Sequence, residues 1–287
     1  MKVLHGHNPG VSDPAPQGLP RIPLLKEAPS EPAPSLAEPL NIEYTSTRVL
    51  PHALQRLQRH HGVVKPDRST LAESFRMLRN RVLLRMRAEG HRLLAVTSPR
   101  ALKDKSLTAI NLALTMAADY DAAVLLVDAD LTGRGVQTLF GLDGAPGLAD
   151  HLVAGIPIPQ LLVNPGVPRF VLMPASREPV LASAELLATR ATQQLVREMR
   201  DRYRDRYIIV DLPPLLDSAD AIAFLPQADT TLVVIEEHGT SLQDMQRMNE
   251  LLAPFNLIGS VMSQPREPEV TPARAGPWYR RWWPVGR

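Results

Sequence analysis

The fold is decided by a short apolar run that ends in two carboxylates, VLLVDAD at residues 124–130. Four consecutive apolar residues before a polar pair are typical of a strand that is buried on both faces. Because side chains alternate along an extended chain, Asp128 and Asp130 project to the same side. We expect a buried strand over 123–128 that delivers both carboxylates at its carboxyl end.

Two other runs lead into chemically active residues. IIVDLPP at residues 208–214 delivers Asp211 at the end of a buried strand, and TSPRALKDKS at residues 97–106 runs from a strand into a helix. A phosphate-binding loop needs backbone amides at a helix N-terminus, a Lys for the outer phosphates and a Ser or Thr for Mg²⁺. Lys105 and Ser106 stand at the last two places, although the glycine pattern of such a loop is not met.

Helix and strand patterns alternate through most of the chain. This alternation, with short connections, predicts an α/β fold: a three-layer, P-loop NTPase-like domain with a mostly parallel sheet. In such sheets ligands bind beyond the carboxyl ends of the strands. The expected strands are 91–97, 123–128, 170–173, 207–211, 231–235 and 257–262, and the expected helices are 69–88, 105–118, 184–204, 218–224 and 241–253.

Composition divides the chain into four parts. Proline is concentrated in residues 1–40, which predicts a disordered tail, and residues 41–65 are expected to be an extended linker. Residues 66–263 form the expected P-loop α/β domain. Residues 264–287 form a second expected disordered tail, rich in Pro, Arg and Trp.

Charge and cysteine content exclude several classes of protein. The 287 residues carry 32 Lys and Arg against 30 Asp and Glu, so nothing points to nucleic acid as a partner. The absence of Cys excludes disulfides, thiolate metal sites and cysteine nucleophiles. No apolar run reaches the ~18 residues of a membrane span, and no secretory signal opens the chain, so a cytoplasmic protein is expected.

The three strand-end aspartates leave two interpretations open. Each carboxylate could cap the turn or helix that follows it, which Asp does often. Alternatively, carboxylates gathered at one sheet edge beside Lys105 and Ser106 would form a nucleotide site, where Mg²⁺ and phosphate offset their mutual repulsion. The combination favours the nucleotide site.

Together these segments resemble the bacterial tyrosine autokinases of exopolysaccharide and capsule synthesis, a branch of the P-loop ATPases that also holds the MinD/ParA proteins. The resemblance runs from about residue 42 to residue 262. Its markers are the Asp128-Ala129-Asp130 run, the Asp211-Leu212-Pro213-Pro214 run, and the spacing Glu73-x-x-Arg76-x-x-Arg79. The last matches the element through which members of the family assemble into rings, and its three residues share one helix face.

The resemblance implies ATP and Mg²⁺ as cofactors. Lys105 would hold the β- and γ-phosphates, while Asp128 and Asp130 would position the metal and activate a tyrosine hydroxyl. The implied catalytic residues are Lys105, Asp128 and Asp130; the implied metal ligands are Ser106, Asp130 and Asp211; and the implied nucleotide-binding residues are Ser98, Lys103, Asp104, Lys105, Ser106 and Leu107.

The family also implies partners. Its members phosphorylate tyrosines of their own C-terminal tails and work with a membrane-anchored chain-length determinant protein. This implies a homo-oligomer that regulates exopolysaccharide synthesis at the inner face of the cell membrane, without nucleic acid. Tyr279 is the implied phosphoacceptor, and Glu73, Arg76 and Arg79 are the implied oligomerisation residues.

The phosphate loop departs from the family pattern. Leu102 and Asp104 replace two glycines that let the backbone approach phosphate. A carboxylate near the β-phosphate costs about 1–4 kcal/mol, so ATP binding is expected to be weak or lost. Three functions therefore compete: a tyrosine kinase, a catalytically inactive scaffold that assembles with the membrane protein, and a MinD/ParA-like positioning ATPase.

Overall fold

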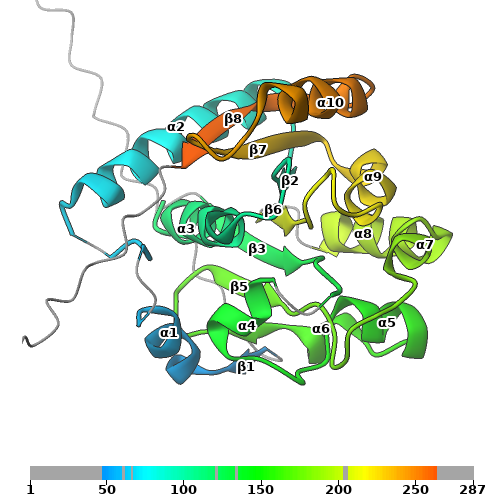
Figure 1. Ribbon diagram of the computed structural model, residues 1–287. Coiled ribbons are helices and arrows are strands. Elements are labelled where there is room, and N and C mark those ends of the chain that lie inside the picture. Colours follow the sequence, from blue (N-terminus) through cyan, green and yellow to red (C-terminus); the bar gives the residue numbers. More distant parts are fainter. Residues whose placement is uncertain are drawn as a thin grey trace, which may run out of the picture. The chain divides into compact units, whose positions relative to one another are not determined.

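The computed structural model describes residues 47–263, except 60–61, 66, 120–121, 133–134 and 203–205. The expected disordered tails and Tyr279 lie outside these residues. An eight-stranded sheet crosses the described part in the order β1-β4-β5-β3-β6-β2-β7-β8 (Figure 1). The strands are β1 (Arg48–Val49), β2 (Leu93–Thr97), β3 (Ala123–Asp128), β4 (Val163–Asn164), β5 (Phe170–Met173), β6 (Arg206–Asp211), β7 (Thr230–Glu236) and β8 (Leu257–Ser263).

The sheet is mostly parallel, as the sequence predicts. Neighbouring strands pair in parallel everywhere in it except between β4 and β5, which are antiparallel. β6 lies between β3 and β2, and its Asp211 is in register with Asp128 of β3 and with Val96 of β2. The carboxyl ends of these three strands therefore meet at one edge of the sheet.

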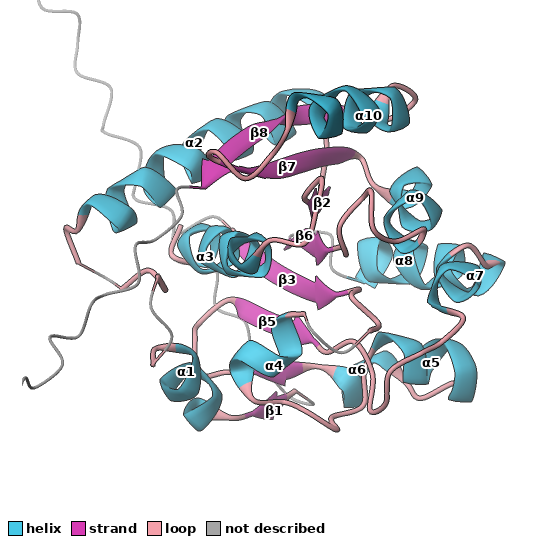
Figure 2. Cartoon of the chain, in the orientation of Figure 1, coloured by secondary structure: helices cyan, strands magenta, loops and turns pink. Residues whose placement is uncertain are grey.

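Helices cover both faces of the sheet and complete three layers (Figure 2). On the described residues they are α1 (Pro51–Leu57), α2 (Thr70–Glu89), α3 (Lys103–Ala117), α4 (Val136–Phe140), α5 (Leu148–Ala154), α6 (Ile158–Leu161), α7 (Ser183–Leu187), α8 (Arg190–Arg202), α9 (Asp220–Phe224) and α10 (Leu242–Leu252).

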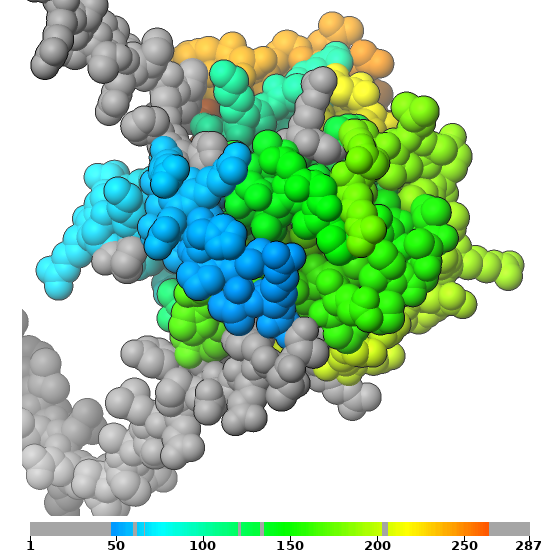
Figure 3. All heavy atoms as spheres, turned by 90° about the horizontal axis from the view of Figure 1, so that it is seen from below, coloured from blue at the N-terminus to red at the C-terminus, as the bar shows by residue number. Residues whose placement is uncertain are grey.

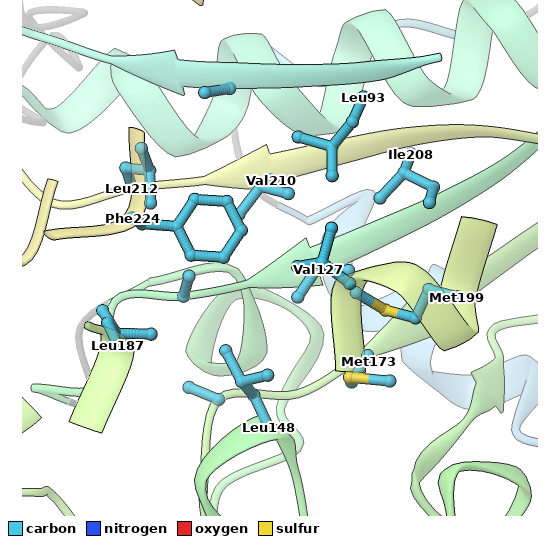
Figure 4. Packing of buried hydrophobic residues seen from close by; sticks show 14 of the residues in the cluster. Leu93, Val127, Leu148, Met173, Leu187, Met199, Ile208, Val210, Leu212 and Phe224 are labelled. Atoms are coloured by element: carbon cyan, nitrogen blue, oxygen red, sulfur yellow. The ribbon is translucent and has the colours of Figure 1, made fainter. Parts of the chain in front are cut away.

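The core forms two clusters, one on each face, because neighbouring residues of a strand point to opposite sides. Leu93 and Ala95 of β2 belong to one cluster, and Leu94 and Val96 belong to the other. Figure 4 shows the first cluster, where Phe224 of α9 and side chains of α5, α7 and α8 pack onto the sheet. The second cluster lies under α1, α2, α3 and α4.

Helix α2 shows how local sequence sets an element's ends. The Ser69 hydroxyl accepts the amide of Ala72 and so caps the N-terminus. Gly90 ends the helix at a φ of 69°, a left-handed conformation that glycine adopts without a steric penalty. Between these ends α2 buries Val82, Leu83 and Met86 against the sheet.

The expected extended linker is wrong in part, because residues 47–57 join the folded core. β1 pairs with β4, and α1 buries Ala53 and Leu57 completely. The blue patch in Figure 3 is this segment, which lies against the green surface that includes α4. Pro51 at the first position of α1 favours a helix start and was the signal for this helix in the sequence.

The long helix expected over 184–204 is also wrong, because it is two helices, α7 and α8. Thr189 lies between them, and its hydroxyl accepts the amide of Thr192 and donates to the carbonyl of Leu186. A threonine that caps a new helix in this way interrupts a continuous helical pattern. The six expected strands and the other expected helices are confirmed, with ends shifted by one or two residues.

Among the described residues, no helix is both long and apolar enough to cross a membrane.

Candidate functional site

The three strand ends bring the predicted site residues together. Five residues separate the end of β2 at Thr97 from the start of α3 at Lys103, so the first turn of α3 lies beside the end of β6. Lys105 and Ser106 in this first turn are buried, with 4% and 8% of their surfaces exposed. The predicted passage from a strand into a helix is therefore confirmed, and the first turn of this helix contacts the strand-end carboxylate of Asp211.

Asp211 is the centre of this cluster. Its Oδ1 accepts a hydrogen bond from Lys105 Nζ at 2.6 Å, and its Oδ2 accepts one from Ser106 Oγ at 2.6 Å. Lys105 Nζ also lies 3.3 Å from Ser106 Oγ. Burial raises the pKa of Asp211, and the Lys105 ammonium opposes that rise. Lysine, serine and aspartate thus form a neutralised, closed cluster with the composition of a P-loop phosphate and Mg²⁺ site.

Asp128 sits in the neighbouring position but has different partners. Its Oδ2 accepts the backbone amide of Gln137 at 2.7 Å, in the first turn of α4, and its Oδ1 accepts the amide of Asp130 at 3.1 Å. Burial, and then the nearby Asp211 carboxylate, raise the pKa of Asp128 well above its usual range. Its geometry is that of a buried cap for α4.

Close backbone approach makes this cap possible. Gly135 lies against the Asp128 carboxylate, and a Cβ at that position would be 2.2 Å from Asp128 Oδ1. Any other residue would force the carboxylate or the turn to move. Gly135 is a site residue that the sequence interpretation missed, and its signal is the second glycine of the Gly133-x-Gly135 spacing shortly after a strand-end Asp.

Asp130 is slightly more accessible, with 7% of its surface exposed. Its Oδ1 accepts both the amide of Thr132, at 3.3 Å, and the Thr132 hydroxyl, at 2.5 Å. This is the hydrogen-bond pattern of an Asx turn. Both interpretations of the strand-end aspartates therefore have a counterpart: Asp128 and Asp130 cap a helix and a turn, and Asp211 meets the lysine and serine of the loop.

The other predicted nucleotide-binding residues are spread around the loop. Ser98 is fully buried and its hydroxyl donates to the carbonyl of Arg100 at 2.7 Å, whereas the Lys103 side chain is exposed. Leu107 is half-buried and packs onto the core under α3. Leu102 precedes α3 and packs onto the same cluster. Whether these residues contact a nucleotide stays a prediction.

Asp104 has a different orientation from the expected one. Its Oδ2 accepts a hydrogen bond from Ser263 Oγ at 2.6 Å, at the end of β8. It lines a groove of about 550 Å³ between α2, α3 and β8, where Phe75 and Met262 are among its neighbours. In this conformation the carboxylate is engaged at β8 and not with the Lys105 and Asp211 cluster.

The proposed assembly residues lie on α2. Arg76 Nη1 is 2.5 Å from Glu73 Oε2, so these two exposed residues pair within the helix. Arg79 points to α3, where its Nη1 donates to the carbonyl of Thr115 at 3.3 Å. Arg79 thus satisfies a carbonyl near the C-terminus of α3 and has a structural contact of its own.

The residues fit a nucleotide with Mg²⁺ better than a free metal ion. Among the described residues no three His, Asp or Glu side chains are grouped as ligands for an ion. The Ser106 hydroxyl and one carboxylate, Asp211, are the hard oxygen donors beside Lys105. Mg²⁺ is commonly held by one or two protein oxygens and completed by phosphates and water, which suits this donor set.

Comparisons with known proteins show which proteins this chain is similar to. A family model described as an AAA domain matches residues 94–258. The succinoglycan biosynthesis transport protein ExoP of Rhizobium meliloti is 32% identical over 184 residues, which cover 63% of this chain and 23% of ExoP. The tyrosine-protein kinase YwqD of Bacillus subtilis is 28% identical over 210 residues, which cover 72% of this chain and 87% of YwqD.

A solved structure shares the fold. The kinase domain of Escherichia coli tyrosine kinase ETK matches with a TM-score of 0.64 at 23% identity, over 78% of this chain and 91% of that domain. This chain spans only 24% or 25% of the length of three further bacterial relatives. The matched family model spans the phosphate loop and the Lys105, Ser106 and Asp211 cluster, so the chain belongs to the AAA domain family, and over most of the same residues it is similar to bacterial tyrosine-protein kinases.

Proposed function

We propose that this protein is an ATP-dependent protein-tyrosine kinase that regulates exopolysaccharide production. The observation that carries the proposal is the contact of Asp211 with both Lys105 and Ser106 at the N-terminus of α3. A lysine, a hydroxyl and a strand-end carboxylate at a helix N-terminus are the groups that P-loop enzymes use for phosphate and Mg²⁺. ExoP is named as a succinoglycan biosynthesis transport protein, and YwqD is named as a tyrosine-protein kinase.

Each residue would have a separate task. Mg·ATP supplies the phosphoryl group that passes to a tyrosine hydroxyl. Lys105 would turn from Asp211 to the outer phosphates, and Ser106 and Asp211 would hold Mg²⁺. The hydroxyl proton would pass to Asp130, which is nearer the surface, because both oxygens of Asp128 already accept backbone amides.

The loop is expected to bind ATP weakly. Leu102 still places a Cβ where the family has glycine, which restricts the approach of the backbone to phosphate. Asp104 is held at Ser263 Oγ, so its charge is directed to β8. The repulsion expected from the sequence is therefore smaller than if Asp104 faced Lys105.

Calorimetric titration with Mg·ADP and Mg·ATP tests the site directly. We expect measurable binding by the wild type, loss of binding in Ser106→Ala, and tighter binding in the Leu102→Gly, Asp104→Gly double variant. Phosphotyrosine formation with Mg·ATP, read at Tyr279 by mass spectrometry, tests the reaction. No binding by the wild type together with binding by the double variant would show that the site has been lost.

We also propose that α2 mediates self-assembly and that the assembly docks on a membrane-anchored chain-length determinant protein at the inner face of the membrane. The exposed Glu73 and Arg76 pair is available to a neighbouring copy. Arg76→Ala and Arg79→Ala are compared by sedimentation, because each also removes a contact within the chain: Arg76 donates to the carbonyl of Asp67, and Arg79 donates to the carbonyl of Thr115. An unchanged sedimentation coefficient in Arg76→Ala would argue against this role.

One observation favours a second function, that of a catalytically inactive scaffold. Lys105 and Asp211 neutralise each other in a buried pair, so the cluster is satisfied without nucleotide. A scaffold would export polysaccharide normally in Ser106→Ala at matched protein levels, whereas a kinase would not. Arg76→Ala would impair export under either function.

A further inference from the structure

The phosphate loop is fastened to the segment that follows β6. Three contacts of 2.8–3.0 Å join them in order: the amide of Leu215 to the carbonyl of Ser98, the amide of Leu216 to the carbonyl of Pro99, and the amide of Ala101 to Asp217 Oδ2. The first two contacts use backbone groups alone. The third uses the Asp217 side chain, so the Ala101 amide of the loop already donates to a carboxylate of the protein itself.

Arg100 makes two further contacts at the same part of the loop. Its Nη1 donates to Asp217 Oδ1 at 2.8 Å, and its Nε donates to Asp244 Oδ1 at 3.0 Å. Asp244 lies in the first turn of α10, so Arg100 ties the loop both to the segment after β6 and to a helix. These carboxylate contacts raise the pKa of Arg100, and hydrogen bonds from Ser241 and then Arg100 lower the pKa of Asp244. Both groups are therefore charged at neutral pH.

Lys105, which the proposed function assigns to phosphate, is almost out of reach of solvent. The Lys105 side chain is 5% exposed and Asp211 is not exposed at all. An incoming triphosphate must therefore move the loop or draw Lys105 out of its pair. The two carboxylates around one guanidinium also leave a net charge of −1 beside the loop, which disfavours an approaching polyanion.

We infer that Arg100, Asp217 and Asp244 form a clamp that holds the phosphate loop closed over Lys105, and that nucleotide binding requires its release. The clamp rests on the proposed function, since it regulates the same site. Asp217 is a positioning residue in this scheme: it occupies the Ala101 amide and anchors Arg100, and it does not touch the reacting atoms. The side chains of Arg100 and Asp217 are 47% and 34% exposed, so their ion pair is weak enough to open and is sensitive to salt.

Chemical accessibility of Lys105 tests the clamp without any nucleotide. The full chain is treated briefly with an amine-reactive reagent, and modification of Lys105 is measured by mass spectrometry relative to exposed Lys65. We expect Asp217→Ala to speed Lys105 modification about three- to tenfold, because it removes both the ion pair and the amide contact. Asp217→Asn keeps an acceptor for the amide and should give a smaller increase.

Two controls separate the clamp from a general loss of stability. Glu198→Gln breaks the exposed pair with Arg202 on α8, also 2.8 Å long, and should leave Lys105 unchanged. Raising the salt concentration should speed Lys105 modification more in the wild type than in Asp217→Ala, because the wild type has two clamp ion pairs to screen and the variant keeps only the pair of Arg100 with Asp244. Urea midpoints confirm that each variant is folded.

Titration of the same variants with Mg·ADP keeps the two proposals distinguishable. If Lys105 becomes more reactive and Mg·ADP binds three- to tenfold more tightly in Asp217→Ala, both proposals stand. If Lys105 becomes more reactive but no variant binds Mg·ADP, the clamp over Lys105 stands, while its role in nucleotide binding and the kinase function both fail. Equal Lys105 reactivity in the wild type and Asp217→Ala would overturn the clamp.

Discussion

Asp211 and Asp128 end neighbouring strands in matching register, yet the protein uses them differently. Both carboxylates are fully buried. Asp211 contacts an ammonium and a hydroxyl, which are side chains that can turn toward a ligand. Asp128 contacts two backbone amides, which are fixed by the turn and by α4. An apolar strand that ends in Asp thus gives Asp211 contacts with side chains that can turn to a ligand, and it gives Asp128 contacts with fixed backbone amides.

The comparison shows that the role of a buried Asp depends on the groups that its carboxylate contacts. A buried charge needs compensation, and a cation supplies more of it than two amides do. The pKa values follow this rule: Lys105 opposes the rise in the pKa of Asp211, whereas Asp128 has the larger rise and no direct cation. The predictions below alter one partner at a time.

The largest effect is expected when Asp211 loses its cation. Lys105→Met leaves a buried carboxylate with only the Ser106 hydroxyl, which should lower the free energy of unfolding by about 3–5 kcal/mol. Urea unfolding of the purified variant measures this change. The Lys105→Met, Asp211→Asn double variant should recover part of the loss, since it removes the unpaired charge. Equal stability of the single variant and the wild type would show that the pair contributes little.

The next effect concerns the backbone around Asp128. Gly135→Ala places a Cβ 2.2 Å from Asp128 Oδ1, so the carboxylate or the turn must shift, at a cost of about 1–3 kcal/mol. Gly239→Ala is the matched control: its Cβ would meet the end of the Glu236 side chain, which can move aside. A similar, small change of the urea midpoint in both variants would contradict the importance of the close approach at Asp128.

A third effect is the pH dependence of the free energy of unfolding that the raised pKa of Asp128 produces. The raised pKa of Asp128 means that the folded protein binds this proton more tightly than the unfolded chain, whose Asp groups titrate near pH ~3.9. This group therefore favours the folded state at low pH, and that contribution is lost as the pH rises through the raised pKa. Every tenfold gain in proton affinity on folding corresponds to about 1.4 kcal/mol of unfolding free energy.

Asp128→Asn isolates this contribution. The difference in unfolding free energy between the variant and the wild type should move in favour of the variant as the pH rises from about 4 toward neutrality. Urea titrations across this range, at constant salt, measure it. Groups whose pKa is lowered, such as Asp229, act in the opposite direction but cancel in the difference. A difference that is constant with pH would mean that Asp128 titrates normally.

The sheet could be predicted from sequence because its strands are continuous apolar runs between polar turns. The runs at 124–127 and 208–210 have no competing helical pattern, and both are strands of the core. The short elements could not be predicted in this way. β1 and β4 have two residues each, too few for a periodic pattern, and they form only because each pairs with another part of the chain.

The site could be predicted only for residues whose spacing in the sequence determines where they lie in the fold. Lys105 and Ser106 follow a strand at the distance that a helix N-terminus requires, and they do meet Asp211. The orientation of Asp104 could not be predicted, because Ser263 lies 159 residues away in sequence. The clamp residues Arg100, Asp217 and Asp244 were missed for the same reason: their charges pair across the fold.

The smallest effect is expected at Asp130, which shares features of both carboxylates. Like Asp128 it accepts a backbone amide, and like Asp211 it accepts a hydroxyl, in this case both from Thr132. Thr132→Val removes only the hydroxyl, which should cost about 0.5–1.5 kcal/mol of unfolding free energy, while Thr132→Ser should be close to neutral. If Asp130 receives the tyrosine proton, freeing its oxygen in Thr132→Val should also change the rate of phosphotyrosine formation, which Thr132→Ser should preserve. A stability loss without any change of this rate would assign Asp130 to the turn alone and group it with Asp128.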